Sequence, residues 1–181
     1  MDTLTFPLSN RLMVLTAPHA ASMLMLELTA RLSAVGELRV LDGGNRFNVY
    51  PVARAVRRHT TDVTASLGRI RLSRAFTCYQ VAALLAETPA DGLPTLVIDL
   101  LAAFYDDNVR LSESQRLLTG CIFHLRRLSQ FAPVVVSAKP PTLLCAEKGV
   151  LVDALQAVAC DYWQLEALPA QKVPTLWGEE A

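Results

Sequence analysis

The residues with the clearest chemical potential lie in a short turn near the start of the chain. Residues 17–24, Ala-Pro-His-Ala-Ala-Ser-Met-Leu, separate an apolar stretch typical of a strand (11–16) from one typical of a helix (20–34). Strand, turn and helix follow in this order around the phosphate-binding loop Gly-x-x-x-x-Gly-Lys-Ser/Thr. The turn is therefore either an ordinary connection or a phosphate loop that has lost its chemistry.

Placed on that loop pattern, Ala17 and Ser22 replace the glycines, Met23 the lysine and Leu24 the hydroxyl residue. Glycines let backbone N–H groups wrap the phosphates, the lysine neutralises their charge, and the hydroxyl binds Mg²⁺. Methionine and leucine can do none of this, and His19 is a poor substitute for the lysine. We expect any nucleotide-binding role of these four positions to be vestigial, and no cofactor to be bound.

Two more polar side chains follow apolar strand-like stretches. Asp99 lies in the stretch 95–100, and Lys139 comes directly after 133–138. Ligands of open parallel sheets gather at the carboxyl ends of the strands, so we expect both residues at the same edge as the turn. The alternatives are an aspartate that only ends a strand and an ordinary exposed lysine before Pro-Pro.

Other sources of chemistry are sparse. The three histidines have no carboxylate or cysteine at metal-ligand spacing, and no Cys-x-x-Cys motif is present. The cysteines are predicted to be buried free thiols of a reducing compartment. The first residues lack a basic segment followed by an apolar core, which favours a cytoplasmic location. The histidines are His19, His59 and His124, and the cysteines are Cys78, Cys121, Cys145 and Cys160.

Composition indicates one domain with a large core. The chain has 181 residues, of which 52% are hydrophobic, and we expect a single domain over 1–181. No apolar run approaches the roughly 20 residues that span a bilayer, so no membrane association is expected.

Charge is distributed unevenly although the net charge is zero. Residues 46–74 hold seven arginines against one acid, and 140–181 hold two lysines against six acids. The pattern predicts either a basic face that contacts DNA or a partner, or an ordinary solvated surface with ion pairs. The candidate contacts are Arg46, Arg54, Arg57 and Arg58.

Short apolar stretches alternate with helical periodicity along the chain. This alternation predicts a three-layer α/β/α sandwich with a mainly parallel sheet and right-handed crossovers. Two of the strand stretches are almost continuously apolar, as parallel strands covered on both faces are. A Ser112–Gln115 pair has the spacing of a helix N-terminus. Strands are expected at 11–16, 38–42, 69–73, 95–100, 133–138 and, more weakly, 161–168, and helices at 20–34, 50–59, 77–88, 111–131 and 148–159.

The order of these segments resembles the core of RecA/RadA-type recombinases and their paralogues. Residues 42–47, Asp-Gly-Gly-Asn-Arg-Phe, match the family's Asp-x-Glu-x-x-Phe pattern except at the glutamate. Residues 69–85 are similar to its strand, Arg-Ala-Phe/Tyr turn and Gln-bearing helix. Residues 95–100 resemble its Walker B strand, and 111–138 its long helix and the strand that follows. The resemblance implies a RecA-like fold with strand order 3-2-4-5-1 and a sixth strand beyond the first.

The same resemblance implies that the hydrolytic machinery is missing. The family's catalytic glutamate falls on Gly44, which supplies no base, and its phosphate-sensing residue falls near Lys139. Asp99 alone remains of the metal-linked set. We expect a non-hydrolysing accessory in DNA recombination or repair that binds DNA, a RecA-like partner or further copies of itself. The alternatives are an atypical ATPase that uses Asp99 and Lys139, and a structural scaffold.

Overall fold

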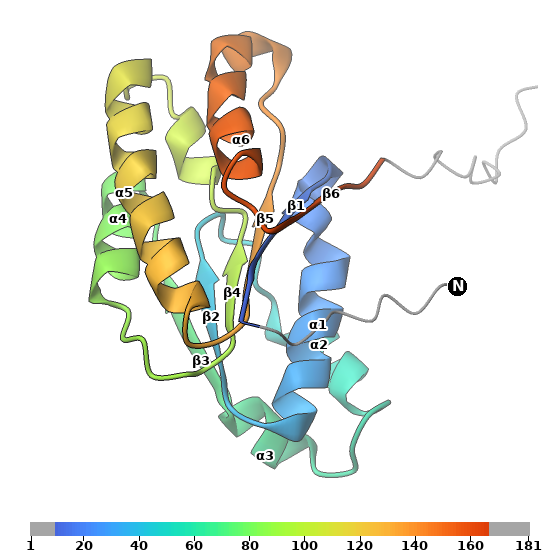
Figure 1. The fold of residues 1–181 in the computed structure, drawn as a ribbon. Helices are drawn as coiled ribbons and strands as arrows, with labels where there is room; N and C mark the ends of the chain where they lie inside the picture. The colour runs from blue at the N-terminus through green and yellow to red at the C-terminus, as the bar shows by residue number, and fades with distance from the viewer. Residues whose placement is uncertain (1–9, 167–181) are drawn as a thin grey trace, which may run out of the picture.

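The fold is built on a six-stranded sheet in which all neighbouring strands run parallel (Figure 1). The computed structural model describes residues 10–166. The strands are β1 (Leu12–Thr16), β2 (Leu38–Asp42), β3 (Ile70–Arg74), β4 (Thr95–Ile98), β5 (Val134–Ala138) and β6 (Asp161–Gln164). Their order across the sheet is β3-β2-β4-β5-β1-β6. This is the order that the resemblance implied, with the sixth strand beside the first. The part of the sixth stretch at 167–168 lies outside the described residues.

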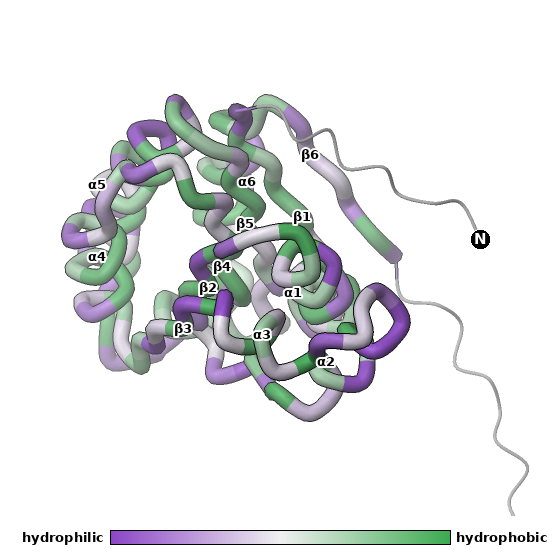
Figure 2. Tube along the Cα trace, turned by 90° about the horizontal axis from the view of Figure 1, so that it is seen from below, coloured by the Kyte–Doolittle hydropathy of each residue, from purple (hydrophilic) through white to green (hydrophobic). Residues whose placement is uncertain are grey.

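Helices cover both faces of the sheet, which confirms the three-layer α/β/α class. Figure 2 shows α1, α2 and α3 on one side of the strands and α4, α5 and α6 on the other. Short 3-10 helices η1, η2 and η3 follow β1, β4 and β5. The bounds are η1 (Pro18–Ala21), α1 (Ser22–Val35), α2 (Val49–Val56), α3 (Val63–Gly68), α4 (Cys78–Glu87), η2 (Ala102–Tyr105), α5 (Leu111–Ser129), η3 (Leu143–Lys148) and α6 (Gly149–Gln156).

Each face of the sheet has its own hydrophobic core. Successive side chains of a strand point to opposite faces, so one strand serves both cores. In β1, Leu12 and Val14 pack under α4, α5 and α6, whereas Met13 and Leu15 pack under α1 and α2. Burial on both sides is the reason that the central strands are almost continuously apolar.

Helix α5 packs as its periodicity predicts and begins at residue 111 as expected, but Ser112 does not cap it. Its apolar stripe is buried, whereas Ser112 is exposed inside the first turn. The carbonyl of Arg110 already accepts the N–H groups of Glu113 and Ser114, so Arg110 is the N-cap residue. The predicted cap at Ser112 was wrong because the helical hydrogen bonding starts two residues before it. The buried stripe consists of Leu117, Leu118, Cys121, Leu125 and Leu128.

Two further local features differ from expectation. Helix α3 was not predicted, because six residues are too few to show a helical period; Asp62 caps it by accepting the N–H of Ala65 at 2.9 Å. Three of the four cysteines are buried free thiols as predicted, but Cys160 is exposed. Cys160 lies in the short connection between α6 and β6.

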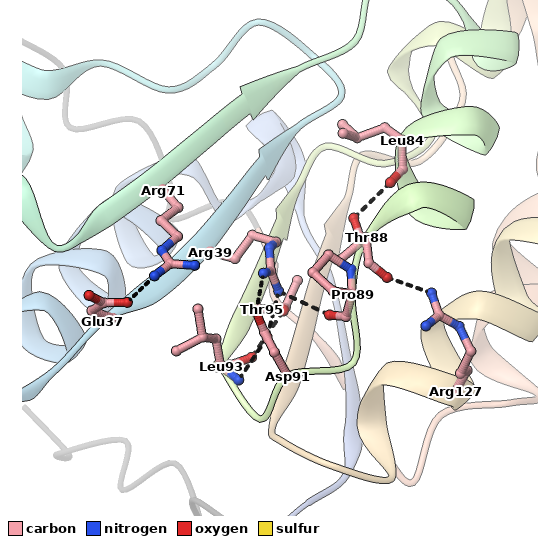
Figure 3. Close-up of polar contacts among 10 residues, drawn as sticks. All are labelled: Glu37, Arg39, Arg71, Leu84, Thr88, Pro89, Asp91, Leu93, Thr95 and Arg127. Atoms are coloured by element: carbon pink, nitrogen blue, oxygen red, sulfur yellow. Dashed lines mark hydrogen bonds and ion pairs between the residues drawn. The ribbon is translucent and has the colours of Figure 1, made fainter.

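Several arginines hold the amino-terminal edge of the sheet together (Figure 3). Arg39, only 7% exposed, binds both carboxylate oxygens of Asp91 at 2.9 and 3.3 Å and the carbonyl of Pro89. The ion pair lowers the pKa of the Asp91 carboxyl. Arg127 donates to the carbonyls of Leu85 and Thr88 at the end of α4. Arginine is suited to these roles because its planar fork satisfies several acceptors at once.

None of the helices within residues 10–166 combines the length and apolar character needed to cross a lipid bilayer.

Candidate functional site

The candidate site is the carboxyl-terminal edge of the sheet. The helices that follow the neighbouring strands β5 and β1 lie on opposite faces, and so do those that follow β2 and β4. Such a change of face opens the crevice in which parallel sheets bind ligands. Within the described residues, all non-glycine residues with positive φ lie in the loops at this edge. They are His19, Ala20, Ala21, Asn45 and Asp99.

The turn after β1 keeps a tightly wound backbone without any glycine. His19, Ala20 and Ala21 have φ values of 57°, 52° and 50°, a left-handed conformation that costs about 1–2 kcal/mol per residue. Ser22 then begins α1, and its hydroxyl donates to the carbonyl of His19. Strain of this kind persists only where the surrounding structure imposes it, and it clusters at binding sites and switches.

The side chains of the turn are not those of a phosphate site. Ala17 is buried after β1, Leu24 is half-buried, and Met23, at the lysine position, is 75% exposed. The turn and the two residues after β6 line an open, mainly apolar groove of about 500 Å³. Its lining residues are Ala17, Pro18, His19, Ala21, Ser22, Met23, Leu24, Leu165 and Glu166.

Asp42, the last residue of β2, organises the next loop. Its fully buried carboxylate accepts the N–H groups of Arg46 and Phe47 at 2.9 and 3.0 Å and pairs with the Arg74 guanidinium at 3.4 Å. Arg74 in turn donates to the carbonyl of Phe47 and to Asn45. Asp42 is therefore fully engaged in holding the loop of residues 43–47 against the strand end.

Asp99 lies at the centre of the edge, where β4 ends. Its side chain is 1% exposed, and its φ of 52° turns it back towards the loop after β2. Arg46 donates to its Oδ2 at 3.3 Å, and Ser137 accepts its backbone N–H at 3.0 Å. The backbone N–H of Lys139 faces the carboxyl, and its Oδ1 is otherwise without a partner among the described residues. Burial raises the pKa of Asp99, and Arg46 and Lys139 only partly oppose the rise.

Gly44 packs directly on Asp99. A β-carbon at Gly44 would lie 2.7 Å from Oδ2 and 2.9 Å from Cγ of Asp99. No side chain fits there without moving one of the two strand ends. The glycine pair of residues 43–44 was the signal for this close approach, because glycine allows backbone to lie against a neighbour.

Lys139 lies beside Asp99, as expected from its place after β5. Its side chain is half-buried, and its carbonyl accepts the Tyr105 hydroxyl at 2.8 Å. Burial raises the pKa of Tyr105, so the hydroxyl stays protonated and keeps donating. A small hollow of about 190 Å³ lies between Lys139, Tyr105 and Asp107.

The four candidate arginine contacts do not form one group. Arg46 is engaged by Asp99, whereas Arg54, Arg57 and Arg58 lie along the end of α2. Arg58 pairs with Glu27 of α1. The side chains of Arg54 and Arg57 are exposed and make no hydrogen bond or ion pair with any residue in the described part of the chain.

Glu27 of α1 contacts several basic side chains on this surface besides Arg58. It also accepts from Arg31 at 3.3 Å and contacts Nε2 of His59 at 2.9 Å. Partial burial raises the pKa of Glu27, but the contacts with His59, Arg58 and Arg31 outweigh it, so the pKa lies below its usual value. Part of the arginine excess of residues 46–74 is thus neutralised by acids. The side chains of Arg54 and Arg57 remain without a partner among the described residues.

Lys148 was not singled out from the sequence. Its side chain is buried, and Nζ donates to the carbonyls of Phe104, Asp106 and Val109 at 3.0, 2.7 and 3.1 Å. It ties the start of α6 to the loop that follows Asp99 and η2. No sequence pattern could have shown this, because its acceptors are backbone groups about 40 residues away.

Comparison of the chain with models of known protein families, and with curated proteins, finds no match. The fold and the site define an α/β protein with an all-parallel six-stranded sheet. Its carboxyl-edge crevice is occupied by an internal ion pair, and the turn after β1 is apolar.

Proposed function

We propose that the protein is a non-hydrolysing RecA-like accessory that binds DNA or a partner protein in recombination or repair. The RecA-like part of the proposal rests on the resemblance of the segments described above and on the strand order. The observation that carries the loss of hydrolysis is the ion pair at 3.3 Å between exposed Arg46 and buried Asp99, against which Gly44 packs.

The residues at the edge do not fit Mg-ATP. The turn after β1 has no lysine or arginine to neutralise phosphate, because Met23 and Leu24 stand where the lysine and the hydroxyl would be. The carboxyl of Asp99, which would align the metal, is already paired with Arg46, and burial favours its neutral form. A hydrolytic base at position 44 would overlap Asp99.

Two surfaces support a binding role. Arg54 in the last turn of α2 and Arg57 directly after it present guanidinium groups without a partner among the described residues, and arginine forks match phosphate and carboxylate oxygens. On η3, after β5, Leu143 and Leu144 are 96% and 95% exposed. Exposed neighbouring apolar side chains of this size favour contact with another protein, either a partner or a further copy of the chain.

The alternative of an atypical ATPase has one supporting observation. Lys139 lies close enough to Asp99 for its charge to act on the pKa of that carboxyl. An enzyme of this kind would release phosphate from ATP and would lose the activity on Lys139→Met. Steady release with that dependence would replace the accessory proposal.

The nucleotide part of the proposal is tested by thermal unfolding with Mg-ATP. A millimolar ligand at a micromolar site would stabilise the protein by about 4 kcal/mol, and we expect no such shift.

The DNA part is tested by titrating duplex DNA at several salt concentrations. Arg54→Gln with Arg57→Gln should weaken binding and lower the slope of log K against log salt by about 0.9 per lost phosphate contact. Arg110→Gln with Arg126→Gln is the matched control, since these two exposed arginines also lack a partner among the described residues. Equal losses in both pairs would mean nonspecific attraction only.

The assembly part is tested by light scattering with and without Leu143→Asp and Leu144→Asp. We expect a mass above the 19.8 kDa of one chain that falls to the monomer value in the variants. A wild-type monomer that is indifferent to DNA would leave only the scaffold alternative.

A further inference from the structure

Two features at the carboxyl-terminal edge of the sheet are complementary in shape and chemistry. On η3, Leu143 and Leu144 are 96% and 95% exposed, so two neighbouring leucines project from the fold. The other feature is the open groove of about 500 Å³ that the turn after β1 forms with Leu165 and Glu166. The groove is mainly apolar, and Met23, one of its lining residues, is 75% exposed. Projecting apolar side chains and an apolar recess of this size favour contact with each other.

The leucines of one chain do not line the groove of the same chain, because the two features lie on opposite faces of the sheet. Leu144 lines the small hollow beside Tyr105, which packs against the core under α4, α5 and α6. The groove includes the start of α1, which lies on the other face together with α2 and α3 (Figure 2). Because β5 and β1 are neighbouring strands, η3 and the turn after β1 begin only one strand spacing apart, about 4.8 Å.

A second copy of the chain brings the two features together. When the carboxyl-terminal edges of two copies face each other across a two-fold axis that runs along the edge, the rotation exchanges the two faces of the sheet. The leucines of each copy then lie opposite the groove of the other, displaced by about one strand spacing. An isologous contact of this kind uses each feature twice and closes, so it gives a dimer and not a filament.

Charged groups beside the two features pair across this contact. Lys139 lies in the hollow next to Leu144, and Glu166 lies in the groove. Neither the Lys139 ammonium nor the Glu166 carboxylate has a hydrogen bond or ion pair within residues 10–166, and buried Asp99 only acts on Lys139 from a distance. Both groups lie beside the contact between leucines and groove, so each Lys139 meets a Glu166 of the other copy.

The remaining charged groups of the two features do not oppose the contact. Asp107 lines the same hollow as Lys139, and His19 lines the groove, from which it can donate to Asp107 of the other copy. The ammonium of Lys148 is buried and bound by three carbonyls, so it adds no exposed charge. Glu147 is exposed on η3 and remains in solvent.

We propose that two copies of the chain dock edge to edge, with Leu143 and Leu144 of each copy in the groove of the other. Lys139 of each copy pairs with Glu166 of the other, and the dimer covers the turn after β1 in both. This assignment rests on the assembly part of the function proposed above: it names a second copy as the partner of the two leucines and the groove as the place where they bind.

Sedimentation velocity of the full chain over about a hundredfold range of concentration measures the dimer and its dissociation constant. We expect Met23→Asp, on the groove side, to raise this constant at least about tenfold, as Leu144→Asp does on the leucine side. Val35→Asp is the matched control, since Val35 is 84% exposed at the other end of α1 and should leave the constant unchanged. Lys139→Glu or Glu166→Lys alone should weaken the dimer, and the two changes together should restore it.

Cysteine cross-linking locates the contact. In a Cys160→Ser background, which removes the exposed native thiol, Met23→Cys with Leu143→Cys should give a disulfide-linked dimer under mild oxidation. Either new cysteine alone, or Val35→Cys in place of Met23→Cys, should give none. Far-UV circular dichroism and the urea midpoint show whether each variant keeps its fold, and the double charge exchange tests the contact without altering its apolar groups.

The possible failures separate this proposal from the function proposed above. If Leu144→Asp dissociates the dimer and Met23→Asp does not, the assembly through the leucines stands and the groove assignment is wrong. A wild-type chain that stays monomeric at all concentrations refutes the dimer and leaves DNA binding to be decided by its own titration. Species larger than a dimer, or a disulfide within one chain, refute the two-fold contact.

Discussion

A β-carbon added to Gly44 would lie 2.6 Å from the β-carbon of Asp99. The ends of β2 and β4 therefore meet so closely that only a glycine fits on one of them. The contact places backbone against the one acid that remains of the expected metal-linked set. It makes the absence of a glutamate at position 44 a packing requirement of this chain.

Restoring the missing glutamate should damage the protein. We expect Gly44→Glu to lower the free energy of unfolding by about 1–3 kcal/mol through overpacking, and to bring no phosphate release from ATP. Urea unfolding and a phosphate assay measure the two effects. Gly120→Ala is the control: it lies in α5 with nothing near its β-carbon position, and should stabilise by roughly 0.5–1 kcal/mol. A stable, hydrolysing Gly44→Glu protein would refute both the packing argument and the accessory proposal.

Removing the partner of Asp99 should make stability depend on pH. The ordinary pKa of this carboxyl is 3.8, and burial raises it in the folded protein. The folded state therefore favours the protonated carboxyl more than the unfolded state does. This contribution to the free energy of unfolding is complete below pH 3.8 and is lost as the pH rises through the raised pKa. Arg46 limits that rise. We expect Arg46→Met to cost about 1–3 kcal/mol at neutral pH, and the cost to disappear as pH falls towards 3.8.

Urea unfolding of the two proteins across pH measures this difference. Lys139 is the other charged group that acts on Asp99 and is unchanged in both proteins. Arg110→Met serves as control, because Arg110 is exposed and has no ion pair within residues 10–166. A penalty for Arg46→Met that is the same at all pH values would mean that only packing is lost.

Lys148 should be among the most sensitive charged residues. Lys148→Met removes three hydrogen bonds and leaves three carbonyls to find other donors, so we expect a loss of about 2–4 kcal/mol. Lys148→Arg should not rescue the protein, because a planar fork cannot reproduce three bonds from one ammonium. Chemical denaturation measures both, with Arg126→Met as an exposed control. If Lys148→Met lowers the free energy of unfolding by less than Arg126→Met does, water replaces the ammonium as donor to the three carbonyls.

Thiol reactivity should distinguish Cys160 from the other cysteines. Burial raises the pKa of Cys121 to about 12 and also raises that of Cys78, so neither forms the reactive thiolate at neutral pH. Native protein should therefore react at one thiol and unfolded protein at all four, as counted by mass spectrometry. Cys160→Ser should remove the native reaction. Two modified thiols in the native protein would show that a second cysteine becomes accessible.

The sequence alone determined the class of the fold and the position of the candidate edge. Continuously apolar strands such as 134–138 can only be covered on both faces, and the alternation with helices leaves a parallel sheet as the solution. Because parallel strands end at one edge, Asp99 and Lys139 were expected together, and the structure places them together. The sequence alone also showed that apolar Met23 and Leu24 occupy the positions of the lysine and the hydroxyl residue.

The tertiary structure alone decided which charges are free. Arg46 and Arg54 look alike in the sequence, yet Arg46 is bound to an acid 53 residues away while Arg54 is free of any described partner. Lys148 is engaged by carbonyls from another loop, and Cys160, alone among the four cysteines, is exposed. The reason is physical: periodicity reports local geometry and burial, whereas an ion pair depends on which distant segments the sheet order brings within about 4 Å.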